Sequence, residues 1–176
     1  MSVEAKLRAA IRDVPDFPKA GIVFKDITPI MQNAELSNEV LDEMYNMYKD
    51  QDIDAVAGIE SRGFLFGYPL AMRLGLPFIL IRKKGKLPYE KISHDYDLEY
   101  GSATIEMHTD AVGDQQKVLI HDDLLATGGS AEAAAHLITK SGGQVAGFNF
   151  LVALDFLQGD KKLKNFSDNI SSFVNY

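Results

Sequence analysis

Residues 118–130 read VLIHDDLLATGGS, an apolar strand followed by two carboxylates and then by a turn of small residues. Gly128 and Gly129 lack a Cβ atom, so the backbone at these positions can wrap closely around an anion. Thr127 and Ser130 add hydroxyl groups, and a helix beginning here contributes its N–H donors and the positive end of its dipole. The segment therefore predicts a cradle for a phosphate monoester.

Two aspartates come directly before this turn. Asp122 and Asp123, if both ionised, would repel each other and a phosphate unless they bound hydroxyl groups or a hydrated Mg²⁺. A sugar diol next to the phosphate would meet this need. Taken separately, Asp-Asp can simply end a strand and Thr-Gly-Gly-Ser can simply cap a helix; their contiguity favours a ligand site.

Strand and helix patterns alternate on both sides of this segment. Strands are predicted at 53–59, 77–82, 102–109, 118–121 and 145–154, and helices at 3–13, from Ser37 onward, at 64–74 and at 130–140. A Pro-rich connector is expected at 15–29, and a long connection without clear periodicity at 84–101. The alternation indicates an α/β fold with a mostly parallel sheet covered on both faces. Ligands of such sheets bind beyond the carboxyl ends of the strands, so the loops after Ile59, Arg82 and His121 should converge on one crevice.

The composition and charge of the chain exclude several classes of protein. The 176 residues suit one domain with a sizeable core. A formal net charge of −7 argues against binding a polyanion, and the absence of cysteine excludes disulfides and thiolate nucleophiles. The N-terminus has no pattern of a signal peptide, and no stretch approaches the roughly 18 apolar residues of a membrane span. We expect a cytoplasmic protein without nucleic-acid or membrane partners.

Four segments together resemble the adenine phosphoribosyltransferase family, a branch of the type I phosphoribosyltransferases. They are 118–130, 17–29 (FPKAGIVFKDITP), 60–64 (ESRGF), and 82–88 (RKKGKLP) with 98–101 (LEYG). The similarity runs in order from about residue 7 to the C-terminus. It implies a type I phosphoribosyltransferase fold as a single domain over 1–176, with a small N-terminal hood largely in 1–35 and a flexible lid loop at about 84–101.

The resemblance also implies a reaction. The 5-phosphoribosyl group of 5-phosphoribosyl 1-pyrophosphate (PRPP) would pass to adenine, giving AMP and pyrophosphate in purine salvage. Mg²⁺ would be required and would be bound mainly through the substrate, with Asp122 and Asp123 as the candidate protein ligands. A homodimer is expected because the family usually forms one.

The family's binding roles transfer to residues of this chain. The resemblance implies that the cradle and the residues before it bind the ribose and 5′-phosphate of PRPP: Asp122, Asp123, Ala126, Thr127, Gly128, Gly129 and Ser130. It also implies that an exposed turn and a basic cluster bind the pyrophosphate: Glu60, Ser61, Arg62, Gly63, Arg82, Lys83 and Lys86. An ordinary surface ion pair is the alternative for Arg62, and a solvated strand end is the alternative for the lysines.

The resemblance implies that adenine is bound by Val23, Phe24, Lys25 and Leu124. Backbone hydrogen bonds would recognise the purine edge, and apolar side chains would contact its faces. The catalytic candidates are Glu99, Tyr100 and Arg62. Glu99 would stabilise the positive charge that develops on the ribose or accept the purine proton, and Tyr100 would donate to the pyrophosphate. An exposed glutamate that is merely solvated remains the alternative for Glu99.

Four positions depart from the family pattern. Lys25 stands where relatives commonly carry Arg, and His121 replaces the usual aliphatic residue, with packing beneath the site as its expected role. Ala153 and Asp160 differ from the Glu and Arg that relatives often have there. Both lie outside the four site segments, so they bear on subunit or tail contacts more than on the reaction.

Two other functions remain as alternatives. One is a phosphoribosyltransferase for another base such as xanthine, since only the 17–29 segment argues for adenine. The other is a regulator that senses PRPP and binds nucleic acid. The net charge and the retained pyrophosphate and lid residues argue against the regulator.

Overall fold

The computed structural model describes residues 1–97 and 101–176. The chain forms two compact units, Met1–Met47 and Tyr48–Tyr176. Among the described residues, no helix combines the length and apolar character that crossing a bilayer requires. The single domain with a hood at 1–35 stays a prediction.

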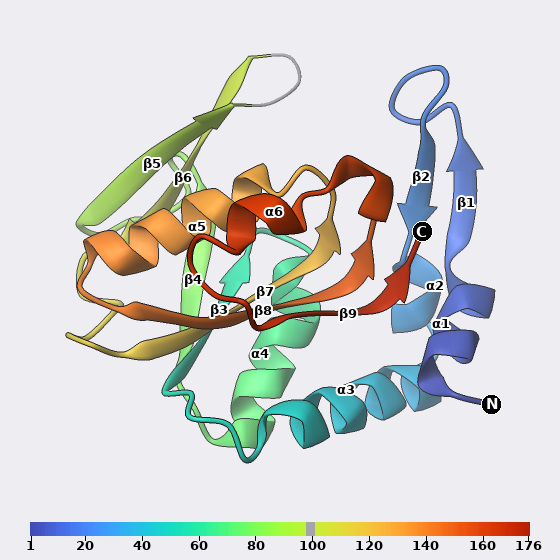
Figure 1. The fold of residues 1–176 in the computed structure, drawn as a ribbon, viewed down its shortest axis with the longest axis horizontal. Helices are drawn as coiled ribbons and strands as arrows, with labels where there is room; N and C mark the ends of the chain where they lie inside the picture. The colour runs from blue at the N-terminus through green and yellow to red at the C-terminus, as the bar shows by residue number, and fades with distance from the viewer. Residues whose placement is uncertain (98–100) are drawn as a thin grey trace. The chain divides into compact units, whose positions relative to one another are not determined.

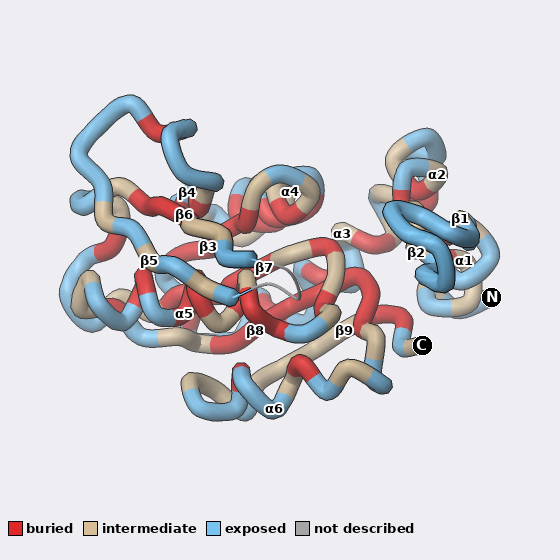
Figure 2. The backbone as a smooth tube through the Cα atoms, turned by 90° about the horizontal axis from the view of Figure 1, so that it is seen from above, coloured by how far each residue is buried: buried red, intermediate tan, exposed pale blue. Residues whose placement is uncertain are grey.

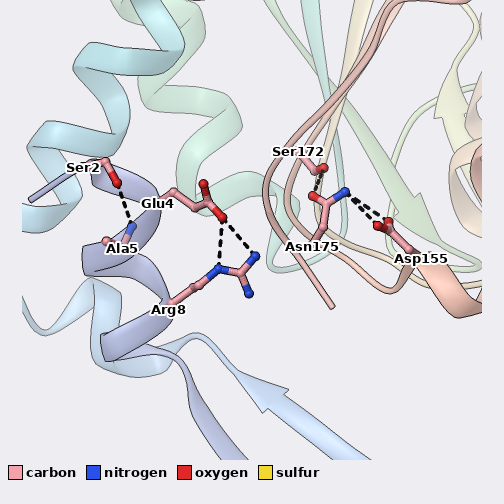
Figure 3. Close-up of polar contacts among 7 residues, drawn as sticks. All are labelled: Ser2, Glu4, Ala5, Arg8, Asp155, Ser172 and Asn175. Carbon is pink, nitrogen blue, oxygen red and sulfur yellow. Dashed lines mark hydrogen bonds and ion pairs between the residues drawn. The ribbon is translucent and has the colours of Figure 1, made fainter.

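The first unit contains three helices and an antiparallel hairpin (Figure 1). Its elements are α1 (Val3–Ala10), β1 (Arg12–Pro15), β2 (Val23–Asp26), α2 (Thr28–Met31) and α3 (Ala34–Tyr48), whose last residue belongs to the second unit. Ser2 caps α1 by accepting a hydrogen bond from the Ala5 N–H, and Glu4 pairs with Arg8 one turn apart (Figure 3). The connector expected at 15–29 therefore holds a strand and the start of a helix.

The second unit is built on a seven-stranded sheet in the order β5-β6-β4-β3-β7-β8-β9. Neighbours from β4 to β9 run parallel, whereas β5 and β6 are antiparallel to their neighbours. The strands are β3 (Ala55–Ile59), β4 (Phe78–Lys83), β5 (Lys91–Asp97), β6 (Ser102–His108), β7 (Lys117–Leu125), β8 (Gln144–Ala153) and β9 (Ile170–Asn175). This arrangement confirms the predicted α/β fold with a mostly parallel sheet.

Helices cover both faces of this sheet. Figure 2 shows α4 (Gly63–Leu74) on one side and α5 (Gly129–Lys140) with the short α6 (Asp160–Leu163) on the other. All five residues of β3 are buried, as expected for a parallel strand covered on both faces. Under α5 the core contains Ile120, Phe148 and Phe150, none of which is exposed.

Three parts of this unit differ from the sequence-based expectation. The strand predicted at 118–121 continues to Leu125, so both aspartates lie within β7 rather than after it. The connection expected at 84–101 contains β5, which forms a hairpin with β6. The C-terminal segment adds η1 (Asp155–Leu157), α6 and β9, where Asn175 of β9 donates to Asp155 (Figure 3).

Candidate active site

The residues predicted to form a phosphate cradle lie in the turn between β7 and α5. Gly128 has a φ of 81°, in the left-handed region that favours glycine, and a Cβ atom there would lie 2.6 Å from the Gly159 carbonyl oxygen. The first N–H groups of α5 lie at this turn, and a helix has no internal acceptors for them. A cavity at this place is lined by Tyr96, Asp97, Asp122 and residues 124–131. The geometry therefore suits a small anion.

Asp122 lines this cavity, and Asp123 follows it in β7 as a buried side chain. Asp122 Oδ1 accepts a hydrogen bond of 2.9 Å from the Asp123 N–H, and Asp123 Oδ2 pairs with Arg62 Nε at 2.9 Å. Burial raises the pKa of Asp122 well above its usual range, and the negative charge of Asp123 raises it further. Burial also raises the pKa of Asp123, although Arg62 opposes that rise. Hydroxyl donors or a cation next to these two carboxylates would stabilise their ionised forms.

The turn after β3 approaches β7 closely. The peptide bond between Glu60 and Ser61 is cis. A Cβ atom at Gly63 would lie 2.8 Å from the His121 carbonyl oxygen, so a glycine is needed where α4 begins. Together with the pair between Arg62 and Asp123, this contact joins the turn after β3 to strand β7.

The basic cluster lies beside the same turn. Both side-chain oxygens of Glu60 accept hydrogen bonds from Arg82, at 3.2 Å each, and Oε2 also accepts one from the Lys83 N–H. Arg82 Nη1 donates to the Lys86 carbonyl oxygen at 3.0 Å. Burial would raise the pKa of Glu60, but the hydrogen bonds from Arg82 and the Lys83 N–H outweigh it and lower the pKa. The turn after β3 thus contacts both the end of β4 and strand β7 near its carboxyl end.

The residues expected to bind adenine belong to different units. Val23, Phe24 and Lys25 lie in β2, where Phe24 packs edge-on against Phe17 with ring centroids 5.2 Å apart. Lys25 Nζ forms an ion pair with Asp13 Oδ1 at 2.6 Å. The lysine that replaces the usual Arg therefore already has a charged partner. Leu124 lies in β7 of the second unit. Glu99 and Tyr100 lie outside the described residues.

Comparison with known proteins supports one family. Residues 25–171 match the family described as the phosphoribosyl transferase domain. The chain belongs to this family. It is 49% identical over 174 residues to the adenine phosphoribosyltransferase of Cytophaga hutchinsonii, covering 99% of this chain and 96% of that protein. The phosphoribosyltransferase fold and the resemblance predicted from the sequence are confirmed.

Solved structures of adenine phosphoribosyltransferases resemble the chain over nearly its whole length. The enzyme of Thermoanaerobacter pseudethanolicus has a TM-score of 0.94 and 46% identity, covering 98% of this chain and 99% of that one. The enzyme of Saccharomyces cerevisiae has a TM-score of 0.90 and 38% identity, covering 97% and 98%. It was solved with adenine and D-2,5-dideoxy-2,5-imino-altritol 1,6-bisphosphate. Within its family the chain thus belongs to the adenine phosphoribosyltransferases.

Two residues at the cradle of this phosphoribosyltransferase were not predicted from the sequence. Tyr96 lines the cavity, and its hydroxyl accepts a hydrogen bond from Ser130 Oγ at 3.3 Å. Gly159 packs behind the turn, where a Cβ atom would lie 2.4 Å from the Ala126 carbonyl oxygen. The alternation of Ile92, His94 and Tyr96 was a usable signal for the first, whereas nothing local distinguishes Gly159.

His121 is fully buried, as expected for a residue packing beneath the site. Its Nδ1 lies 2.9 Å from Asn149 Oδ1, and Asn149 donates to Ser171 Oγ. Burial lowers the pKa of His121 to about 4, despite the hydrogen bond to Asn149, so the imidazole is neutral near pH 7. Of the other departures, Ala153 is buried in β8, and Asp160 pairs with Lys164 at 2.7 Å.

Proposed function

We propose that the crevice beyond β3, β4 and β7 binds PRPP and transfers its phosphoribosyl group to adenine. The nitrogen of adenine forms a bond to C1 of the ribose while the bond from C1 to the pyrophosphate oxygen breaks. The pyrophosphate leaves with the bonding electrons, and the purine gives up one proton. The observation that carries this proposal is the small-residue cradle next to two carboxylates, the half-buried Asp122 and the buried Asp123.

The 5′-phosphate would lie in the cradle of residues 126–130, with the ribose hydroxyls on the two aspartates. A carboxylate pair accepts hydrogen bonds from a diol without competition from its own donors. The raised pKa values of both groups support this role, because hydroxyl donors would stabilise their ionised forms. Arg62 already holds Asp123 and so would orient it toward the sugar.

The pyrophosphate would lie at the turn formed by Ser61, Arg62 and Gly63. Arg82, Lys83 and Lys86 gather positive charge next to this turn, and Glu60 holds Arg82 and the β4 backbone in place. A fixed guanidinium stabilises the charge that builds up on a leaving pyrophosphate. Glu60 therefore acts on the pyrophosphate site through Arg82.

Adenine would be recognised by Val23, Phe24 and Lys25 of β2 and by Leu124 of β7. Backbone groups of an edge strand can read the purine edge whatever their side chains, so Lys25 in place of Arg is compatible with this role. Glu99 and Tyr100 remain our proposed catalytic residues, with Arg62, for the charge on the ribose and the leaving group.

Mg²⁺ fits the same crevice. Carboxylate and phosphate oxygens are the ligands it prefers, and the negative charge of Asp123, which raises the pKa of Asp122, favours a nearby cation. When bound, Mg²⁺ would neutralise charge on the pyrophosphate. Asp122 and Asp123 would help to hold it, directly or through its water ligands.

We further propose that the chain acts as a homodimer in the cytoplasm. On α4, the apolar side chains of Leu65, Tyr68 and Met72 are 45%, 53% and 64% exposed, at positions that share one face of a helix. An exposed apolar stripe of this kind suits contact with a second copy of the chain.

The decisive experiment incubates the purified protein with Mg²⁺, PRPP and each of adenine, hypoxanthine, guanine and xanthine. We expect AMP from adenine at an initial rate far above that of any other nucleotide. Selective product from another base would overturn the assignment of adenine to residues 23–25. Binding of PRPP without turnover of any base, together with salt-dependent binding of nucleic acid, would favour the regulator instead.

A further inference from the structure

One face of β5 lies along helix α5. Residues of β5 alternate between exposed and half-buried, and the half-buried ones are Ile92, His94 and Tyr96. His94 stacks on His136 of α5, with ring centroids 4.6 Å apart and an angle of 18° between the rings. Two residues further along the strand, the ring of Tyr96 reaches the first turn of the same helix.

Tyr96 packs directly on the cradle. A Cβ atom at Gly129 would lie 3.3 Å from Tyr96 Cδ2 and 3.5 Å from the Asp97 carbonyl oxygen, so the glycine allows the strand to approach this closely. The Tyr96 hydroxyl lies 3.3 Å from Ser130 Oγ. Both residues line the same cavity as Thr127 and Gly128. The phenol therefore adds a polar group to the wall of the proposed phosphate site.

The direction of this hydrogen bond matters for binding an anion. Ser130 donates and Tyr96 accepts, which leaves the phenolic proton for another acceptor. A phosphate in the cradle offers charged oxygen acceptors, and hydrogen bonds to charged groups are stronger than neutral ones. The phenolic proton can turn toward it by rotation of the hydroxyl alone, while Ser130 keeps its hydrogen bond to Tyr96.

We propose that Tyr96 is a binding residue for the 5′-phosphate, donating its phenolic proton to a phosphate oxygen in the cradle of residues 126–130. The inference rests on the proposed function and adds one side chain from the β5–β6 hairpin to that site. The cavity that Tyr96 lines does not include residues 60–63 of the proposed pyrophosphate turn. The effect should therefore be confined to ligands that carry the 5′-phosphate.

The test compares Tyr96→Phe with a matched control, Tyr89→Phe. Phenylalanine keeps the ring packed on Gly129 and removes only the hydroxyl. Tyr89 is 57% exposed and packs edge-on against His108, away from the cradle. Calorimetry measures the affinity of each protein for ribose 5-phosphate and for pyrophosphate, and steady-state kinetics give KM for PRPP and kcat.

For Tyr96→Phe we expect the affinity for ribose 5-phosphate to fall about tenfold, with a matching rise in KM for PRPP, as loss of a charge-assisted hydrogen bond predicts. The affinity for pyrophosphate and kcat should change less than about twofold. Tyr89→Phe should match the wild type in all four measurements.

Wild-type affinity of Tyr96→Phe for ribose 5-phosphate would overturn the inference. An equal loss for ribose 5-phosphate and pyrophosphate would also overturn it, because it would indicate a general disturbance of the crevice. Binding of ribose 5-phosphate needs no adenine. A wild-type protein that binds it without making AMP would thus count against the proposed function while the comparison of variants still decides the role of Tyr96.

Discussion

Asp123 combines a buried carboxylate with a partner from another loop. Its pairing with Arg62 fixes the carboxylate at the crevice, while burial raises its pKa, so its ionised form is costly to the fold in the absence of ligand. We expect Asp123→Asn to raise KM for PRPP at least tenfold, because the amide accepts fewer hydrogen bonds from a diol. The melting temperature at pH 7 should stay equal or rise, since the substitution removes a carboxylate whose ionised form is disfavoured by burial. Unchanged kinetics would refute the role in ribose binding.

His121 gives the fold a dependence on pH. Its pKa is about 4 in the folded chain against an ordinary 6.5, so between these values the unfolded chain binds a proton that the folded chain does not. The free energy of unfolding therefore falls as the pH is lowered from 6.5, by up to about 3 kcal/mol near pH 4.

His121→Leu should remove this contribution. Denaturant unfolding between pH 7.5 and pH 4.5 gives the free energy of unfolding at each pH for the variant and the wild type. The contribution of His121 is the difference between the slopes of these two pH profiles. At pH 7.5 the variant should be less stable by about 1–3 kcal/mol, because Asn149 Oδ1 loses its partner. Parallel pH profiles of the two proteins would contradict the prediction.

At the scale of elements, the hairpin of β5 and β6 is held on α5 partly by the two stacked imidazoles. Burial lowers the pKa of His94, and the nearby charges of His136 and Lys140 lower it further, whereas Asp95 and Glu132 oppose the shift. Lys162 lines the adjoining cavity, and Phe166 packs edge-on against His136. Protonating both rings would place two like charges in contact.

We expect amide hydrogens of residues 91–97 to exchange severalfold faster at pH 5.5 than at pH 7.5, after correction for intrinsic exchange. Because the pKa of His94 is lowered, this loss of protection begins as the pH falls below the ordinary histidine value. His136→Phe keeps a stacked ring without the charge and should abolish the difference. Equal protection at both pH values in the wild type would contradict the prediction.

The strands show which parts of the fold can be predicted from the sequence. Buried parallel strands and the helices between them are local patterns, and 53–59, 77–82 and 145–154 were predicted almost residue for residue. The continuation of β7 through Asp122 and Asp123 was missed. The Asp123 carboxylate in this strand pairs with Arg62, which lies 61 residues earlier in the sequence, directly before α4. The strand at 91–97 was missed because its lysine and aspartates obscured the alternation of Ile92, His94 and Tyr96.

The candidate site shows the same limit. The cradle is contiguous in sequence, so its glycines and hydroxyls could be recognised from local backbone requirements, and its role in binding phosphate stays a prediction. Glu60 was assigned to the pyrophosphate, yet its side chain holds Arg82, a pairing between two strand ends that composition cannot reveal. Gly159 and Tyr96 reach the cradle only through tertiary packing.

For the whole molecule, the proposed homodimer makes a prediction about mass. Light scattering should give about 39 kDa, twice the 19.5 kDa of one chain. Met72→Glu places a charge in the exposed stripe of Leu65, Tyr68 and Met72, and burying it against a second copy would be costly. We expect this variant to sediment as a monomer at concentrations where the wild type is dimeric. Phe156→Glu, at a residue 72% exposed outside α4, is the matched control and should stay dimeric. A monomeric wild type would refute the homodimer, and a dimeric Met72→Glu would place its interface away from α4.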